Sequence, residues 1–180
     1  MSDPSENLGF AEVHDVPIPY IHRISSYYQT LGYGKPYEWA RYADVPFALL
    51  EKPLSESRVA LVTTAAPYQP DKGDQGPGAP YNAAAKFYRV YTDSIDGEPD
   101  LRVSHIGIDR KHTTAEDINT WFPLKQLKRL CDEGQIAELT PRFYGAPTNR
   151  SQRTTIDQDC VELLDELRND QADVAIIVAN

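Results

Sequence analysis

The apolar residues of this chain fall first into short runs that are typical of β-strands. The run RVALVTT (58–64) is β-branched and continuous, so it predicts a buried strand, the first of a parallel sheet. The run ADVAIIVAN (172–180) predicts a second buried parallel strand by the same argument. Weaker apolar runs at 86–92 and 101–108 predict two further strands.

Helical spacing of apolar residues predicts three helices. The first has apolar positions three or four residues apart and ends at Gly32 or Gly34. A second helix starts at Pro123, which suits a first helical turn, and ends before Gly134. Its apolar face consists of Leu124, Leu127, Leu130 and Cys131.

The third predicted helix covers the stretch TTIDQDCVELLDELRND (154–170). Thr155 and Gln158 have the spacing of a capping box at its start. Its predicted apolar stripe consists of Ile156, Cys160, Leu163, Leu164 and Leu167.

The order of strands and helices predicts an α/β fold with a mostly parallel sheet flanked by helices, Rossmann-like or flavodoxin-like. Residues 1–57 form a predicted N-terminal arm, irregular, rich in Tyr and Pro and with one helix, and 58–180 form the α/β domain. The aromatic residues of the arm suit either a subunit interface or packing on the chain's own core. Gly- and Pro-rich residues 65–82 and the stretch 139–152 are predicted loops, and no nucleotide-binding glycine motif occurs.

Composition narrows the partners and the location that we expect. The 180 residues carry a net charge of −9, which disfavours nucleic acid and anionic membranes as partners. The chain has no apolar run of about 18 residues and no signal-peptide pattern at its N-terminus, so we expect a cytoplasmic protein. Cys131 and Cys160 are expected to be buried, inert thiols, and no metal site is expected because no Cys/His spacing fits one.

The candidate chemistry lies in the stretch RVSHIGIDRKHTTAEDINTWFP (102–123). Ser104 and His105 end a predicted strand, and Asp109, Asp117 and Asn119 follow within one loop and a short turn. A His among carboxylates can act as a general acid or base. The alternative is a His satisfied by hydrogen bonds at a strand end, with Asp and Asn capping turns.

The chain stops at Asn180, at the end of its most apolar predicted strand. A strand in that place is normally followed by a helix that covers the sheet. Three readings stay open: a truncated chain, a split subunit, or a precursor that is cleaved after Asn180, since the bond after Asn can break by side-chain cyclisation. In each case the α/β domain would be incomplete.

Several ordered motifs resemble the B-subunit family of glycine, sarcosine and betaine reductases, which includes D-proline reductase. The resemblance covers roughly residues 58–180 and starts with the RVALVTTA run. The matching motifs are His105-Ile106, Asp109, Asp117-Ile118-Asn119, Phe122-Pro123-Leu124, Gly134/Ile136, Pro141-Arg142 with Tyr144, and ADVAIIVAN.

This resemblance implies a reductase that cleaves a C–N bond, or a similar C–heteroatom bond, of a small amino-acid-like substrate. In the family, a Cys or Sec nucleophile follows the strand that matches DVAIIVAN, and a partner subunit can carry a pyruvoyl group. This chain has no candidate nucleophile there, so the resemblance implies that a companion C-terminal chain or second subunit supplies it just after Asn180, the processing site. A thioredoxin-like electron donor and an oligomer are also implied.

Site roles follow from the resemblance and from the chemistry of each residue. His105 would be the acid/base group or a substrate anchor, oriented by Asp109, while Arg142 suits a substrate carboxylate. The further predicted substrate-binding residues are Thr63, Thr64, Ser104, Asp117, Asn119 and Tyr144. For each of these the alternative is a bracing role in a loop or at a strand end.

Two other classes of function are alternatives to the reductase. One is a non-catalytic scaffold or interaction subunit that kept the fold without the redox chemistry. The other is a cofactor-free isomerase or lyase, which needs paired nucleophiles on opposite sides of a pocket, and the sequence offers no such pair.

Overall fold

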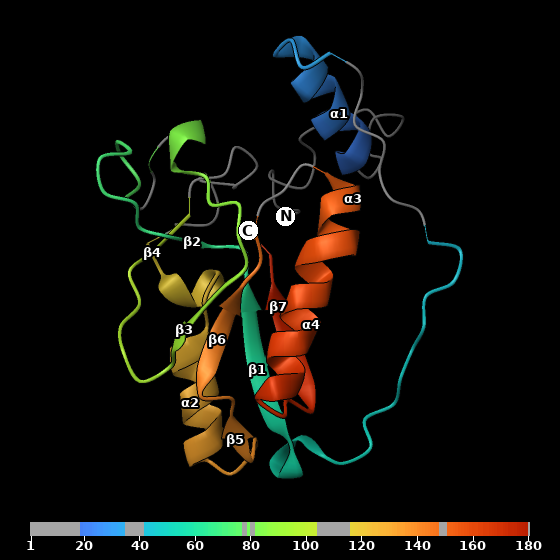
Figure 1. Cartoon of the computed structure of the whole chain (residues 1–180), viewed down its shortest axis with the longest axis vertical. Coiled ribbons are helices and arrows are strands. Elements are labelled where there is room, and N and C mark those ends of the chain that lie inside the picture. The colour runs from blue at the N-terminus through green and yellow to red at the C-terminus, as the bar shows by residue number, and fades with distance from the viewer. Residues whose placement is uncertain are drawn as a thin grey trace, which may run out of the picture. The chain divides into compact units, whose positions relative to one another are not determined.

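The structure is a computed structural model of the chain (Figure 1). It describes residues 19–34, 42–76, 79, 82–103, 116–147 and 151–179. Two compact units divide the chain, Met1–Val45 and Pro46–Asn180. The first contains helix α1 (Tyr20–Thr30), where a helix was predicted, and Gly32 follows it with φ of +81°, a conformation that favours glycine.

The second unit is built on a five-stranded, mostly parallel sheet with helices, so the predicted α/β class is confirmed at this level. Its strands are β1 (Arg58–Thr63), β3 (Tyr91–Ser94), β5 (Glu138–Leu139), β6 (Arg142–Gly145) and β7 (Val174–Val178). β1 is parallel to β5, β6 and β7, and β3 joins β6 antiparallel. The short elements are β2 (Ala66–Pro67), β4 (Leu101–Arg102), η3 (Leu54–Glu56), η4 (Ala83–Ala85), η5 (Ile118–Thr120), α3 (Gln152–Thr154) and η6 (Thr155–Asp159).

β5 and β6 lie one after the other along the same edge of β1. Val59 pairs with Leu139 of β5 on one side and with Val174 of β7 on the other. Further along β1, Val62 pairs with Tyr144 of β6. Between these two pairs β1 has two residues, 60 and 61, whereas the opposite chain has four, 140–143. β5 and β6 are therefore one strand interrupted by a bulge.

Each face of β1 packs against a different helix. Val59 and Leu61 belong to a core with Leu124 and Leu127 of α2 (Leu124–Asp132). Their neighbours Ala60 and Val62 join Tyr144 in a second cluster, against which Leu163 and Leu167 of α4 (Cys160–Asn169) pack. Because side chains alternate along a strand, one buried strand supports both layers, and α4 and α2 lie on opposite sides of the sheet (Figure 1).

Three strand predictions need correction. The stretch 139–152, predicted as a loop, contains β6 and the end of β5, because pairing with β1 stabilises runs too short to show a period. The predicted strand 86–92 gives only β3, which starts at Tyr91 and is antiparallel. Within 101–108, only Leu101–Arg102 forms a described strand, and it pairs antiparallel with β2 outside the main sheet.

The predicted burial of the last strand is wrong, although its position and parallel direction are confirmed. β7 is an edge strand, and its residues alternate between half-buried and exposed. Ile177 is 70% exposed because neither a further strand nor a helix among the described residues covers this end of the sheet.

The start and the stripe of the last helix also differ from prediction. The capping side chain is Ser151, whose Oγ accepts a hydrogen bond from the Thr154 amide at 3.2 Å, in place of the predicted Thr155/Gln158 pair. Of the predicted stripe, only Leu163 and Leu167 pack on the sheet. Cys160 is exposed, so its predicted burial is wrong, whereas Cys131 is half-buried in α2. The predicted apolar face of α2 is confirmed, and Gly134 follows this helix with φ of +70°.

Close packing between β3 and β6 depends on Gly145. This residue lies opposite Tyr91 in the antiparallel pair, and a Cβ atom at position 145 would overlap the Tyr91 ring. The Tyr91 hydroxyl donates to the carbonyl oxygen of Ala65 at 2.6 Å, so the ring has little room to move.

We therefore expect Gly145→Ala to lower the free energy of unfolding by about 1–3 kcal/mol through overpacking. Urea unfolding of the variant would measure it. Gly97→Ala is the matched control, because a Cβ at Gly97 meets nothing within 4 Å. Equal stability of both variants and the parent chain would contradict this account of the packing.

Candidate functional site

The carboxyl ends of β1, β6 and β7 meet at one edge of the sheet, where α/β proteins place their ligands. Thr63 pairs with Gly145 on one side and with Val178 on the other, so these three residues mark the edge. The Thr64 amide then donates to the carbonyl oxygen of Val178 at 3.3 Å. Two of the predicted site residues, Thr63 and Thr64, thus lie at the expected position in the fold.

The Thr63 side chain braces this edge. It is fully buried. Its hydroxyl donates to the carbonyl oxygen of Trp121 at 3.2 Å and accepts from the Ala65 amide at 3.1 Å. The hydroxyl therefore connects the end of β1 to the end of η5, which is the bracing role that the sequence left open.

Asp117 and Asn119 form a local turn beside that edge. One carboxylate oxygen of Asp117, Oδ1, accepts from both the backbone amide of Asn119 at 3.0 Å and its side-chain Nδ2 at 2.9 Å. Thr120 closes the turn through a hydrogen bond from its hydroxyl to the Asp117 carbonyl oxygen at 2.7 Å. Trp121 and Phe122, which follow, are buried in the core and hold the turn at the sheet.

The Asn119 side chain has one polar atom left over. Its Oδ1 is buried and has no hydrogen-bond partner among the described residues, while its Nδ2 donates to Asp117. An unsatisfied buried acceptor costs about 1–3 kcal/mol, so proteins keep few of them. As an acceptor, Oδ1 fits an N–H or O–H group of a ligand and does not fit a carboxylate.

Four predicted site residues lie outside the described residues: Ser104, His105, Asp109 and Asn180. The described chain leads to the first three from Val103, which is buried in the same core as Trp121. It resumes at Glu116, directly before the Asp117 turn. The roles of these four residues stay predictions.

Arg142 and Tyr144 lie on the opposite face of the sheet from Thr63 and the Asp117 turn. The Arg142 Nε donates to Oδ2 of Asp170 at 2.9 Å, and a second guanidinium nitrogen lies 2.8 Å from a carboxylate oxygen of Glu166. The Tyr144 hydroxyl donates to the same Asp170 oxygen at 2.5 Å. The structure thus uses both residues to hold α4 on β6, and it does not bring them together with the other predicted substrate-binding residues.

The pKa shifts of Asp170 and Tyr144 favour the ion pair between Arg142 and Asp170. The hydrogen bond from Arg142 is the main reason why the pKa of Asp170 is lowered. Burial, and then the hydrogen bond to Asp170, raise the pKa of Tyr144 far above its ordinary value. Asp170 is therefore a carboxylate and Tyr144 a neutral phenol at neutral pH. Sequence reasoning missed Asp170 because it lies 28 residues after Arg142. It also lies at the end of a helix, where an Asp is an ordinary residue.

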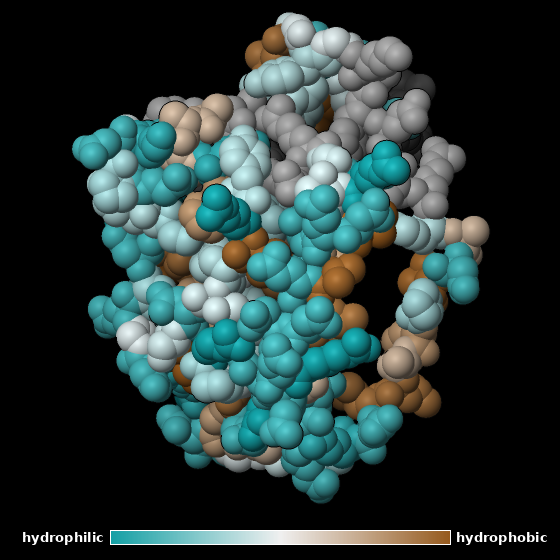
Figure 2. Space-filling view, in the orientation of Figure 1, coloured by the Kyte–Doolittle hydropathy of each residue, from teal (hydrophilic) through white to brown (hydrophobic). Residues whose placement is uncertain are grey.

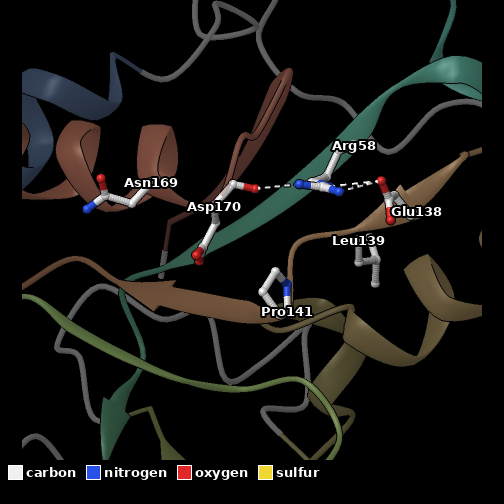
Figure 3. Close-up of a pocket in the computed structure, with 6 residues that line it drawn as sticks. All are labelled: Arg58, Glu138, Leu139, Pro141, Asn169 and Asp170. Atoms are coloured by element: carbon white, nitrogen blue, oxygen red, sulfur yellow. Dashed lines mark hydrogen bonds and ion pairs between the residues drawn. The ribbon is translucent and has the colours of Figure 1, made fainter.

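A pocket of about 370 Å³ opens at the amino edge of the sheet, opposite the candidate site (Figure 3). Its lining residues are Arg58, Glu138, Leu139, Pro141, Asn169 and Asp170. The Arg58 guanidinium is already engaged, donating to Glu138 at 2.9 Å and to the Asp170 carbonyl oxygen at 3.0 Å. This pocket lies where β1 and β5 begin and α4 ends, and none of its lining residues has a free cationic group that could bind an anion.

The two thiols are not placed for chemistry at the carboxyl edge. Cys131 lies in the last turn of α2, before the turn to β5 at the amino edge. Burial is the main cause that raises its pKa, which makes the thiolate scarce at neutral pH. Cys160 begins α4, on the face opposite the Asp117 turn.

The described residues offer no metal site and no membrane-spanning helix. They contain no cluster of three or more His, Cys, Asp or Glu side chains that could hold a metal ion. None of the described helices has the length and apolar character needed to cross a membrane. Comparisons with protein-family models, curated proteins and solved structures find no match to this chain.

The Asp170 cluster predicts a pH-dependent share of stability. Because its folded-state pKa is lowered, the ionised carboxyl stabilises the fold at pH values above its unfolded pKa of about 4. That share disappears as the pH falls through the lower, folded-state pKa. Asp170→Asn should lower the free energy of unfolding at pH 7 by about 1–3 kcal/mol, and the difference from the parent should shrink below pH 4.

Urea unfolding at pH 7, 4 and 3 would test this prediction. Glu98→Gln is the control, since it makes the same change of carboxylate to amide at an exposed position. A constant difference between Asp170→Asn and the parent at all three pH values would contradict the role of the ionised carboxyl.

Proposed function

We propose that this chain is a subunit, or the N-terminal chain, of a reductase of the glycine and proline reductase type. It would cleave a C–N or similar C–heteroatom bond of a small amino-acid-like substrate. The observation that carries this proposal is the buried Oδ1 of Asn119, an acceptor beside the carboxyl edge of the sheet for which the described part of the chain offers no donor. A substrate amine is the donor that such an acceptor would hold.

The chain's own residues would bind and protonate the amine. Asp117 fixes the Asn119 amide so that Oδ1, and not Nδ2, is left for the ligand. His105, oriented by Asp109, would give a proton to the amine as the C–N bond breaks. The companion polypeptide would supply a Cys or Sec nucleophile, whose sulfur or selenium would bond to the substrate carbon as the amine leaves; a pyruvoyl group, which is electrophilic, would instead hold the substrate. A thioredoxin-type dithiol would supply the two electrons and become a disulfide.

The finer features of the fold and setting belong to the same proposal. A Rossmann-like or flavodoxin-like order of strands is consistent with three parallel partners around β1. We place the protein in the cytoplasm as part of an oligomer that includes the companion polypeptide formed or encoded after Asn180. Ser104 and Thr64 remain proposed substrate-binding residues.

A scaffold role is the second candidate, and one observation favours it. Neither cysteine lies at the carboxyl edge, so this chain's described residues supply no nucleophile there. A scaffold subunit would hold the companion polypeptide without taking part in its chemistry. The two candidates differ in whether His105 and Asn119 affect turnover.

A mass measurement followed by an assay tests the proposed function. Denaturing, reducing mass spectrometry of the natively expressed protein should show this chain together with a second polypeptide that begins just after Asn180. That preparation should release ammonia from glycine or methylamine from sarcosine, or open the ring of D-proline to 5-aminopentanoate, with dithiothreitol as the electron donor. Replacing His105 by Ala should abolish release while the far-UV circular dichroism stays unchanged. Unchanged release in the His105 variant would favour the scaffold.

The Asn119 acceptor gives a sharper prediction. Asn119→Leu should lower kcat/KM at least about tenfold, because a substrate N–H would lose its partner. The free energy of unfolding should change by less than about 1 kcal/mol, since loss of the Asp117 hydrogen bond is offset by removal of a buried unsatisfied oxygen. If Asn119 only braces the turn, stability should fall and kcat/KM of the folded fraction should not.

A further inference from the structure

The outer edge of β7 carries backbone groups without a strand partner. β7 pairs with β1 alone, and no described residue pairs with its other side. The Val178 carbonyl oxygen accepts from Thr64, so by alternation the backbone N–H and C=O groups of Ala175 and Ile177 point outward. All five residues of β7 are apolar, without the charge, proline or bulge that normally guards an edge. The edge is therefore able to accept one more strand.

An uncovered segment of the same chain starts beside this edge. Residues 46–51, PFALLE, belong to the same compact unit as the sheet and form neither helix nor strand. Within the described part of the chain they make no hydrogen bond and no ion pair. Phe47 and Leu49 are 87% and 81% exposed. Figure 2 shows apolar surface on both sides of the open space between this segment and the rest of the unit.

Chain geometry directs this segment along β7 in the antiparallel direction. Its C-terminal end is held at the start of β7, because Lys52 forms an ion pair of 2.7 Å with Asp173. A strand advances about 3.4 Å per residue, so the stretch from Lys52 back to Phe47 covers about 17 Å. The stretch from Asp173 to Val178 has the same number of residues and the same length. The segment is therefore long enough to follow the whole of β7.

The side chains of the segment suit either register of such a strand. Phe47 and Leu49 point to one face of an added strand, and Ala48 and Leu50 point to the other. Both pairs are apolar, and so are all the residues of β7. A shift by one residue therefore still places apolar side chains against apolar neighbours on both faces of the sheet.

Backbone and charge also permit the pairing. Residues 47–52 contain no proline, so each has an N–H group to donate. The charges of Glu51 and Lys52 cancel, and closing adds no net charge at the edge. The ion pair at Lys52 keeps the segment close to its own β7, so its effective concentration there exceeds that of the same segment from a second copy.

We propose that the outer edge of β7 is the binding site for residues 47–51 of the same chain, which close over it as an added antiparallel strand. Closing gives the outward groups of Ala175 and Ile177 their partners and covers the exposed Ile177 side chain. It also brings Phe47 beside Val178, at the carboxyl edge, so the closed segment covers one side of the candidate site. This inference goes beyond the proposed function and does not depend on it.

Hydrogen exchange of the whole chain, resolved by residue, tests this closure. The comparison is between the parent and the double variant Phe47→Asp/Leu49→Asp, in which carboxylates hold the segment in water. The amides of Ala175 and Ile177 should exchange about tenfold or more slowly in the parent than in this variant. The amide of Ile176 points toward β1, so its equal exchange in both proteins shows that β7 itself stays paired.

Tyr88→Asp is the matched control. Tyr88 is 58% exposed and precedes β3, at the far edge of the sheet from β7. This variant adds a carboxylate in place of an exposed apolar ring, as the double variant does, and its Ala175 and Ile177 amides should exchange as they do in the parent.

Two results would overturn the proposal. One is equal exchange of Ala175 and Ile177 in the parent and in the double variant, which means that the segment does not cover the edge. The other is protection in the parent that disappears on about hundredfold dilution, because closing within one chain is independent of concentration and pairing with a second copy is not.

Discussion

The pairing of β1 on both edges and its burial on both faces is the constraint on which the rest of this structure depends. Val59 and Ala60 have no exposed surface, and Val59 has a strand partner on either side. A strand in that position fixes the direction of β5, β6 and β7 and the side on which each helix packs. The hydroxyl of its last residue, Thr63, donates to the Trp121 carbonyl oxygen and so links the end of β1 to the segment that follows the Asp117 turn.

The two faces of the sheet differ in how far their polar side chains satisfy one another. On the α4 face, Asp170 accepts from both Arg142 and Tyr144, so the polar groups there satisfy one another. On the other face, Asp117 satisfies only half of the Asn119 amide and leaves a buried acceptor. A group that the fold has left unsatisfied is better placed to receive a ligand than one that the fold already uses.

Particular residues show what could be predicted from the sequence. β1 and α2 were predictable because a continuous apolar run and a regular helical stripe are local signals. β5 and β6 were not, because their few residues form strands only through pairing with β1, far away along the chain. Burial of β7 and Cys160 was overestimated since an apolar residue in the sequence does not reveal whether a neighbour exists to cover it.

The same limit applies to the site. Asp117 and Asn119 lie two residues apart, and their turn was among the predicted alternatives, since Asx side chains bond to nearby backbone. The pairing of Arg142 with Asp170 spans 28 residues and depends on the fold, so the Arg could only be interpreted by its chemistry, as a carboxylate binder. Arg142 does bind a carboxylate, but this carboxylate is the side chain of Asp170 in the same chain.

The carboxyl edge of the sheet and the outer edge of β7 both carry groups that the described residues leave without a partner. At the first, an acceptor is left without a donor, and neither cysteine is placed to attack a ligand. At the second, backbone groups and apolar side chains of a short parallel strand are left without a neighbour. β7 ends at the carboxyl edge, where Val178 pairs with Thr63, so the two incomplete regions adjoin. Natural sheets normally guard an edge strand with charge, proline or a bulge, and the run VAIIV has none of these, so the fold leaves this edge as open as the acceptor at Asn119.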